Sequence, residues 1–320
     1  MTTLSALGFV DLVLGEDYCE AKLEGPGLTK LIDIQASHPQ DVKTIRSHCF
    51  EKHLTAPEFT LEHADMRFRV TTMQLDTGPI WFLSRIDAQV RPLSELPVPK
   101  DFVAFLLRPR LQGLILVTGG FGTGKTTTAA SLFCHRISEL GGTGIALEDP
   151  AAEVRMAGPR GNGRVVQIPV SVKTGGYHAP LQLVRRSRAD FVLIGEIREA
   201  RTAIEAQDIA NTDMPVIATM HASSVEEALD KYQTYLRATN ASSAEANARL
   251  AMTLAGVIHL TKDFGVDTNG NPIVRYIPQS LLLDRNNPMS TGIIGKIRDG
   301  NFMGLNDDIA IQATRRVRGY

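Results

Sequence analysis

The sequence predicts an α/β protein whose larger part is a mostly parallel sheet with helices between its strands. Short, uniformly apolar runs recur beyond about residue 100, and the stretch 126–140 between two of them has helical length. Such runs are typical of central parallel strands buried on both faces. The alternation of strand and helix indicates right-handed crossovers in an open sheet. The apolar runs are LILVT (114–118), GIALE (144–148), FVLIG (191–195) and VIATM (216–220).

The first part of the chain has a different pattern, which predicts a smaller α+β domain. Residues 41–53 have helical spacing, and residues 66–72, MRFRVTT, alternate apolar with polar side chains. This alternation predicts a half-buried strand with arginines on its open face, and residues 80–86 return as a second strand. Pro97 and Pro99 predict an interdomain linker at about 93–100. We therefore expect domains at residues 1–96 and 97–320.

The C-terminal part contains three further segments. Apolar spacing from about residue 243 through residue 260 predicts one helix, and Asn269-Gly270 predicts the turn of a hairpin. Residues 293–302, IIGKIRDGNF, place three isoleucines on one helical face, with Lys296 and Arg298 opposite. This segment is expected to present its basic side chains outward.

Composition excludes several classes of protein. With 43% hydrophobic and 22% charged residues, the chain has the composition of a globular protein. A net charge of −1 gives no overall attraction to nucleic acid or anionic lipid. The three cysteines are scattered, which argues against a disulfide framework or a zinc site. The sequence has neither a signal-peptide pattern nor an apolar run of about 18 residues, so no transmembrane segment is expected.

A phosphate-binding loop is the most specific motif. Residues 119–126 read GGFGTGKT, a full GxxxxGK[ST] between an apolar strand and a helix, which is the context that the motif requires. Glycines let backbone N–H groups point inward, Lys125 reaches the β- and γ-phosphates, and Thr126 offers its hydroxyl to Mg²⁺. No Asn-Lys-x-Asp guanine-reading motif occurs, and ATP with Mg²⁺ is the expected ligand. The expected nucleotide-binding residues are Gly119, Gly120, Phe121, Gly122, Thr123, Gly124, Lys125, Thr126 and Thr127.

Two further polar residues follow apolar strands. Glu196 ends the run FVLIGE and can hold Mg²⁺ through water or activate the attacking water. His221 ends the run VIATMH, where a neutral imidazole can sense the γ-phosphate or simply be a half-buried histidine.

Four segments, in this order, resemble the motifs of the type II/type IV secretion and pilus ATPase superfamily. GGFGTGKTTTAAS resembles its Walker A loop, ALEDPAAEV its aspartate box, VLIGEIREART its Walker B motif and VIATMHASS its histidine box. MRFRV resembles the arginine-bearing strand of its N-terminal domain. Residues 293–302 resemble the C-terminal helix signature of the pilus retraction motors.

The resemblance implies a PAS-like N-terminal domain and a RecA-like ATPase core. It also implies a homohexamer that hydrolyses ATP on the cytoplasmic side of a membrane machine, bound to an inner-membrane platform or to secretion-complex proteins, with no direct nucleic-acid contact. Arginines of the first domain would then act in trans on a neighbour's phosphates, or form a solvated basic face. The implied catalytic residues are Glu196, Glu148, Glu153, His221 and Arg198, and the trans candidates are Arg67, Arg69 and Arg85.

The sequence departs from the family pattern in ways that bear on mechanism. The aspartate box usually reads EDPIE, whereas residues 148–153 here read EDPAAE. The second glutamate is displaced by one position, so the general base can be Glu153, Glu148 or Glu196. The tetracysteine zinc module of the extension branch is missing, which favours the retraction-type and conjugation-type branches.

Two rival functions stay open at this point. One is a RecA-like nucleic-acid translocase or helicase; near-zero net charge and the lack of aromatics in the basic run at residues 185–188 argue against it. The other is an assembly factor that binds ATP without hydrolysing it.

Overall fold

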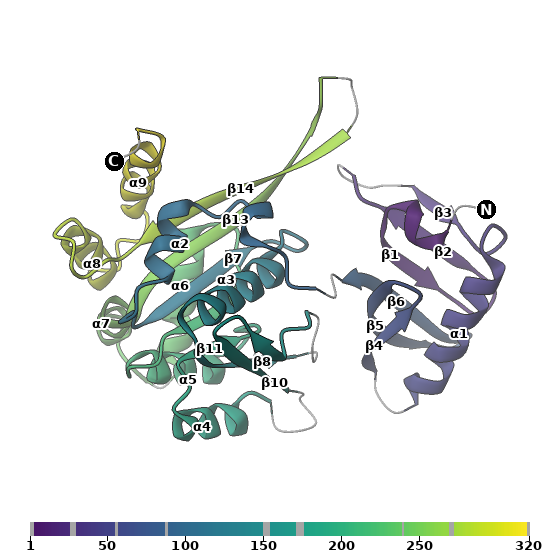
Figure 1. Ribbon diagram of the computed structural model, residues 1–320, viewed down its shortest axis with the longest axis horizontal. Helices are drawn as coiled ribbons and strands as arrows, with labels where there is room; N and C mark the ends of the chain where they lie inside the picture. The colour runs from purple at the N-terminus through teal and green to yellow at the C-terminus, as the bar shows by residue number, and fades with distance from the viewer. Residues whose placement is uncertain are drawn as a thin grey trace. The chain divides into compact units, whose positions relative to one another are not determined.

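The computed structural model describes residues 3–25, 30–54, 57–86, 89–149, 154–170, 176–238, 240–268 and 272–318 (Figure 1). The chain forms two compact units. The first consists mainly of Met1–Gln89, and the second of Val90–Ala152, Met156–Asp263 and Tyr276–Tyr320. The domain bounds expected from the sequence, 1–96 and 97–320, stay a prediction.

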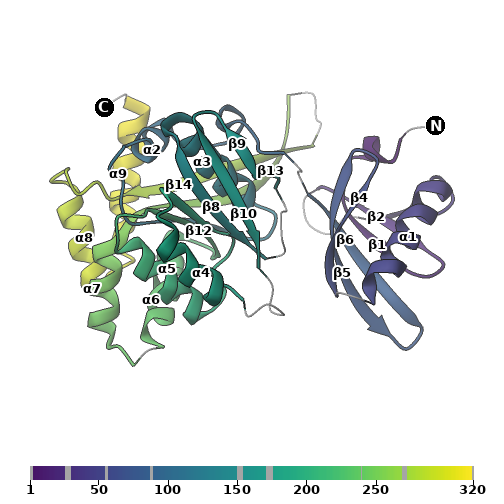
Figure 2. The same ribbon diagram turned by 60° about the horizontal axis from the view of Figure 1, so that its bottom comes forward.

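The first unit is an antiparallel sheet with a helix across one face (Figure 2). The strand order in the described residues is β3-β2-β1-β6-β5-β4. Trp81 and Phe68 of the sheet pack with Val42, Ile45 and Cys49 of the helix in one buried core. Its elements are η1 (Leu4–Leu7), β1 (Phe9–Leu14), β2 (Cys19–Leu23), β3 (Leu31–Asp33), α1 (Pro39–His53), β4 (Glu58–His63), β5 (Met66–Leu75) and β6 (Gly78–Ile86).

The second unit has the predicted α/β architecture. Its sheet has the order β14-β13-β7-β12-β11-β8-β10-β9 in the described residues, and the pairs from β13 to β10 are parallel. The elements are η2 (Leu93–Glu95), α2 (Lys100–Leu106), β7 (Leu114–Gly119), α3 (Lys125–Leu140), β8 (Gly142–Glu148), β9 (Gly158–Arg160), β10 (Gly163–Pro169), α4 (His178–Ser187), β11 (Phe191–Ile194), α5 (Ala200–Ala210), β12 (Val216–His221), α6 (Val225–Arg237), α7 (Ser243–Thr253), β13 (Leu254–Val266), β14 (Pro272–Leu282), α8 (Ser290–Arg298) and α9 (Leu305–Arg318).

Helices cover both faces of this sheet, with α2 and α3 on one side and α4, α5 and α6 on the other (Figures 1 and 2). Every residue of β7 and β11 is buried, as expected for central parallel strands. Within the described residues, no helix combines the length and the apolar character that a bilayer span requires.

The prediction of one helix from about residue 243 through residue 260 is wrong in its second half. The chain leaves α7 at Thr253 and continues directly as β13, because Leu254 already has extended backbone angles. β13 pairs in parallel with β7 and is buried over its first seven residues. A short apolar run cannot be told from a buried helix by periodicity alone. The expected turn at Asn269-Gly270 lies outside the described residues.

In the C-terminal segment, the prediction that both basic side chains point outward is wrong for Lys296. Ile293 and Ile297 of α8 are buried in the core of the second unit, as the apolar face predicted. Lys296 does not point freely outward, however, because its Nζ lies 2.7 Å from the carboxylate of Asp308 and donates to the carbonyl of Gly304 at 2.8 Å. Arg298 is exposed. Lys296 therefore joins α8 to α9.

The start of α7 offers a test of local stability. Ser242 and Glu245 form a capping box in which each side chain accepts from the other's backbone N–H. Ser242→Ala should lower the free energy of unfolding by about 1 kcal/mol, because one helix N–H loses its acceptor. The thermal midpoint should then fall by about 2–4 °C. Ser243→Ala, at the next exposed position, is the matched control, and an equal decrease there would contradict the capping role.

Candidate nucleotide-binding site

The phosphate loop begins where the backbone has no room for a side chain. Gly119 ends β7 with φ +150°, and a Cβ there would lie 2.4 Å from the carbonyl oxygen of Leu260 and 2.6 Å from Oγ1 of Thr123. Thr123 Oγ1 in turn donates to the carbonyl of Gly120 at 3.0 Å. Gly124 precedes α3 with φ +87°, a conformation that favours glycine. These glycines fix the loop between a buried strand and a helix N-terminus.

Strand order brings the candidate polar residues to one edge of the sheet. β12 pairs with β7 so that His221 lies beside Gly119. β11 follows β12 and leads into Glu196, and β8 follows β11 and ends at Glu148. The carboxyl ends of parallel strands form the ligand-binding edge in open α/β sheets. The structure therefore groups the phosphate loop, His221, Glu196 and Glu148.

Lys125 is buried inside the loop, where it contacts a backbone carbonyl and His221. Lys125 is only 7% exposed. The ammonium Nζ donates to the carbonyl of Gly120 at 2.6 Å and lies 3.3 Å from Nδ1 of His221. Since an ammonium can only donate, Nδ1 of His221 must accept.

This contact assigns the charge and tautomer of His221. With Nδ1 accepting, the ring proton is on Nε2, which lies 3.3 Å from Oε1 of Glu196. The other oxygen of Glu196 accepts from Arg198 at 2.7 Å (Nε) and lies 2.6 Å from a second guanidinium nitrogen. Burial lowers the pKa of His221, the Lys125 ammonium lowers it further, and Glu196 opposes both. A continuous chain therefore runs from Lys125 through neutral His221 to Glu196 and Arg198.

The remaining glutamate candidates have different surroundings. Glu148 is 3% exposed and accepts a hydrogen bond from the side-chain amide of Gln167. The amide oxygen of Gln167 accepts in turn from the backbone N–H of Met156 at 3.2 Å. Glu153 lies outside the described residues. The choice of general base among the three glutamates stays a prediction.

Phe121 has a contact that its position in the motif does not predict. It is 88% exposed, yet its ring centroid lies 4.1 Å from that of His221 at an interplanar angle of 41°. Lys231 of α6 also holds this strand end by donating to the carbonyl of His221 at 3.0 Å. Neither contact has a motif signal. Phe121 meets His221 through the pairing of β12 with β7, and Lys231 reaches it from the following helix, ten residues on. Thr126 and Thr127 are half-buried on the first turn of α3.

The three candidate arginines lie in the first unit, and the expectation of an open arginine face is partly wrong. Arg67 is only 8% exposed, whereas Arg69 is half-buried. Both lie on one face of β5. Phe68 lies between these two arginines and faces the other side of the sheet. Arg85 pairs directly with Phe68 and therefore shares that opposite face, where it donates to the carbonyl of Ser5 at 3.3 Å. The structure thus groups Arg67 with Arg69 and separates Arg85 from them.

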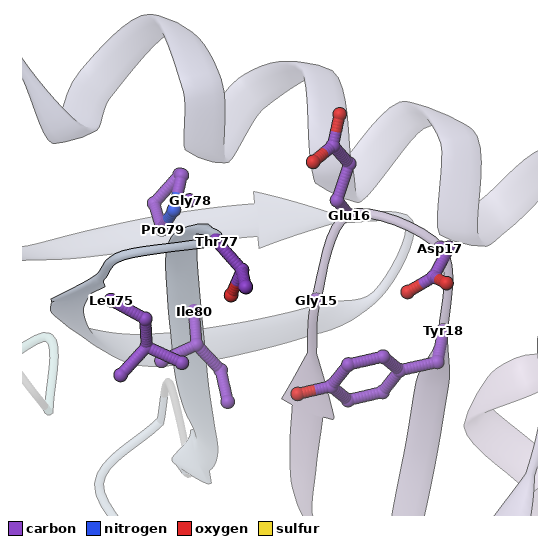
Figure 3. A pocket seen from close by; sticks show the side chains of 9 residues that line it. All are labelled: Gly15, Glu16, Asp17, Tyr18, Leu75, Thr77, Gly78, Pro79 and Ile80. Carbon is purple, nitrogen blue, oxygen red and sulfur yellow. The ribbon is translucent and has the colours of Figure 1, made fainter.

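A cavity of about 370 Å³ lies at one end of the first unit, between the β1–β2 connection and the β5–β6 turn (Figure 3). None of the candidate residues lines it. Its lining residues are Gly15, Glu16, Asp17, Tyr18, Leu75, Thr77, Gly78, Pro79 and Ile80.

Comparisons with known proteins agree with this geometry. A family described as type II/IV secretion system protein matches residues 57–276. The type IV pilus ATPase PilU of Pseudomonas aeruginosa is 30% identical over 166 residues, which cover 52% of this chain and 42% of PilU. The competence protein ComGA of Bacillus subtilis is 35% identical over 111 residues, 34% of this chain and 29% of ComGA. The matches thus span less than half of these relatives.

A solved structure extends the similarity of fold to nearly the whole chain. The crystal structure of the pilus retraction motor PilT with bound ADP has a TM-score of 0.73 at 20% identity, covering 96% of this chain and 87% of that chain. The fold class is therefore the predicted one, a RecA-like core with a smaller PAS-like α+β domain.

The tautomer of His221 is a testable consequence of the Lys125 contact. Ring ¹⁵N NMR should show a neutral imidazole protonated on Nε2, with a pKa below its ordinary value of 6.5. Glu196→Gln should lower this pKa further, because the carboxylate is what raises it. The contribution of His221 to the free energy of unfolding should be complete above about pH 6.5 and be lost as the pH falls through the lowered pKa. A proton on Nδ1 at neutral pH would contradict the assignment.

Proposed function

We propose that this chain, which belongs to the type II/IV secretion system protein family, hydrolyses ATP and, as a homohexamer, powers a membrane-associated machine for pilus retraction, type IV secretion or conjugative transfer. The observation that best supports hydrolysis is that His221, Glu196 and Arg198 form a contacting group beside the phosphate loop, at the carboxyl edge of the sheet. The named relatives are a pilus ATPase and a competence protein, and the PilT structure holds ADP.

Binding of the triphosphate follows from the loop. Backbone N–H groups of residues 119–126 and the N-terminus of α3 provide partial positive charge, and Lys125 provides a full one. Lys125 already lies inside the loop, so it exchanges the Gly120 carbonyl and His221 for phosphate oxygens when the nucleotide binds.

The donor atoms at this edge suit Mg²⁺. The Thr126 hydroxyl and the Glu196 carboxylate offer oxygen, which this cation prefers, and Mg²⁺ keeps several waters, so Glu196 needs to reach it only through water. Bound there, the cation neutralises charge on the transferred phosphoryl group.

Hydrolysis needs a base for the attacking water. As the water oxygen bonds to the γ-phosphorus and the bond to ADP breaks, the water proton passes to a carboxylate. Glu196 is our candidate for this base, because Arg198 and His221 hold its carboxylate at the edge of the sheet beside the phosphate loop. Glu148 is the alternative, held by Gln167, and Glu153 is the third.

The assembly is the broader part of the proposal. We propose that the ring works at the cytoplasmic face of the inner membrane through platform or secretion-complex proteins. Arg69, half-buried on β5, is then the first candidate to reach a neighbouring subunit's phosphates, and Arg67 on the same face is only 8% exposed. Arg85 lies on the opposite face of the sheet, where it donates to the carbonyl of Ser5, and is the separate candidate.

Three substitutions test the chemistry. Lys125→Ala should abolish ATP turnover and most nucleotide affinity, because the triphosphate loses its principal cation. Glu196→Gln should keep ATP binding but lose about 100-fold in kcat, since the amide cannot accept the proton. Steady-state turnover and ATP affinity are measured on folded protein. Near-normal turnover of Lys125→Ala would refute the ATPase assignment. A large loss in Glu148→Gln with a normal Glu196→Gln would move the base to Glu148.

Mixed rings test action in trans. A Lys125→Ala subunit keeps its arginines, and an Arg69→Ala subunit keeps its lysine. Mixing them should restore some turnover, because some sites then receive one intact half from each subunit. The same mixture with Arg85→Ala in place of Arg69→Ala is the matched comparison. If co-assembled rings of Lys125→Ala and Arg69→Ala stay inactive at every mixing ratio, the arginine does not act across the interface.

A further inference from the structure

A second lysine reaches the phosphate loop from a distant strand. Lys262 belongs to β13, two residues beyond Leu260, which pairs with Gly119. The ammonium Nζ of Lys262 lies 3.5 Å from the position that a Cβ of residue 122 would take. This places a second ammonium beside Gly122 of the loop, in addition to the buried Lys125.

The shape of the loop permits this approach. Gly122 has φ +65° and no side chain, so nothing of its own stands between the loop backbone and the ammonium. Backbone N–H groups of such a loop cradle the α- and β-phosphates, whereas the motif lysine reaches the β- and γ-phosphates. A cation beside residue 122 is therefore placed for the diphosphate part of a nucleotide.

An aromatic ring on the next strand supports the lysine. Nζ of Lys262 lies 5.5 Å from the ring centroid of Tyr276 on β14. A cation over an aromatic face is attracted to it and keeps its charge. The ring thus gives this flexible side chain a contact beside the loop.

We propose that Lys262 is a second phosphate-binding residue, which contacts the diphosphate group of nucleoside di- and triphosphates, and that Tyr276 is its positioning residue. The proposal rests on the proposed function, because its ligand is the nucleotide of the phosphate loop. Lys262 and Lys125 then contact the same nucleotide from the same subunit.

The experiment compares affinities for ATP, ADP and AMP, each with Mg²⁺, by calorimetry at low and high salt. Lys262→Met removes the charge and keeps the length, and Lys262→Arg keeps the charge. Lys262→Met should weaken ADP and ATP about 10-fold, as expected for one lost charge-assisted contact. It should leave AMP unchanged, and the difference should shrink at high salt. Lys262→Arg should recover most of the affinity, and Lys100→Ala, at an exposed lysine of the same unit, should bind normally.

The tyrosine gives an independent readout. Tyr276→Phe keeps the ring and should bind ADP normally, whereas Tyr276→Leu should weaken ADP about 3-fold, the loss of an exposed cation–π contact.

Three results would overturn the inference. Unchanged ADP affinity in Lys262→Met, with a wild-type protein that binds ADP, refutes it and leaves the proposed function intact. An equal loss for AMP and ADP would show that Lys262 supports the shape of the loop instead of the phosphates. If the wild-type protein binds no nucleotide, the proposed function and this inference fail together.

Discussion

The close approach of β13 to the end of β7 is the constraint on which the site depends. Gly119 has β12 on one side and β13 on the other, with His221 and Leu260 as its direct partners. The carbonyl of Leu260 occupies the space that a Cβ of residue 119 would need. One residue before this contact, the buried His259 of β13 lies with its Nδ1 3.0 Å from Oγ1 of Thr118 on β7. Because the loop starts from this contact, its position relative to His221 and to Lys262 is set by the register of the sheet.

Charge balance explains why a neutral histidine stands between Lys125 and Glu196. A buried ammonium is costly without hydrogen bonds, and a protonated imidazole beside it would add repulsion. Neutral His221 accepts from Lys125 and directs its own proton toward Glu196, so each donor in this series of contacts faces an acceptor. Phe121 contacts the imidazole, with ring centroids 4.1 Å apart. The phosphate loop thus contributes both the lysine and the ring that packs on its acceptor.

The sequence predicted the parts of the fold and site that depend on local patterns. The central strands, the loop and α3 were predicted correctly, because each carries its own periodicity or motif. β13 was mistaken for helix, since its burial on both faces removes the alternation that marks a strand. Arg67 was expected on an open face, but alternation along a strand does not show whether the second face is covered. Lys262 had no signal at all, because its meaning depends on β13 lying beside the loop.

The C-terminal segment shows how such a contact changes the interpretation of a motif. Helical spacing predicts that Lys296 and Arg298 form one outward basic face. In the structure, Lys296 instead bonds to the carbonyl of Gly304 and to the carboxylate of Asp308, and so ties α8 to α9. Its removal would loosen the packing of these helices, so a loss of function there cannot be assigned to a partner surface. Arg298 is exposed on α8 and keeps the outward position that the helical spacing predicted.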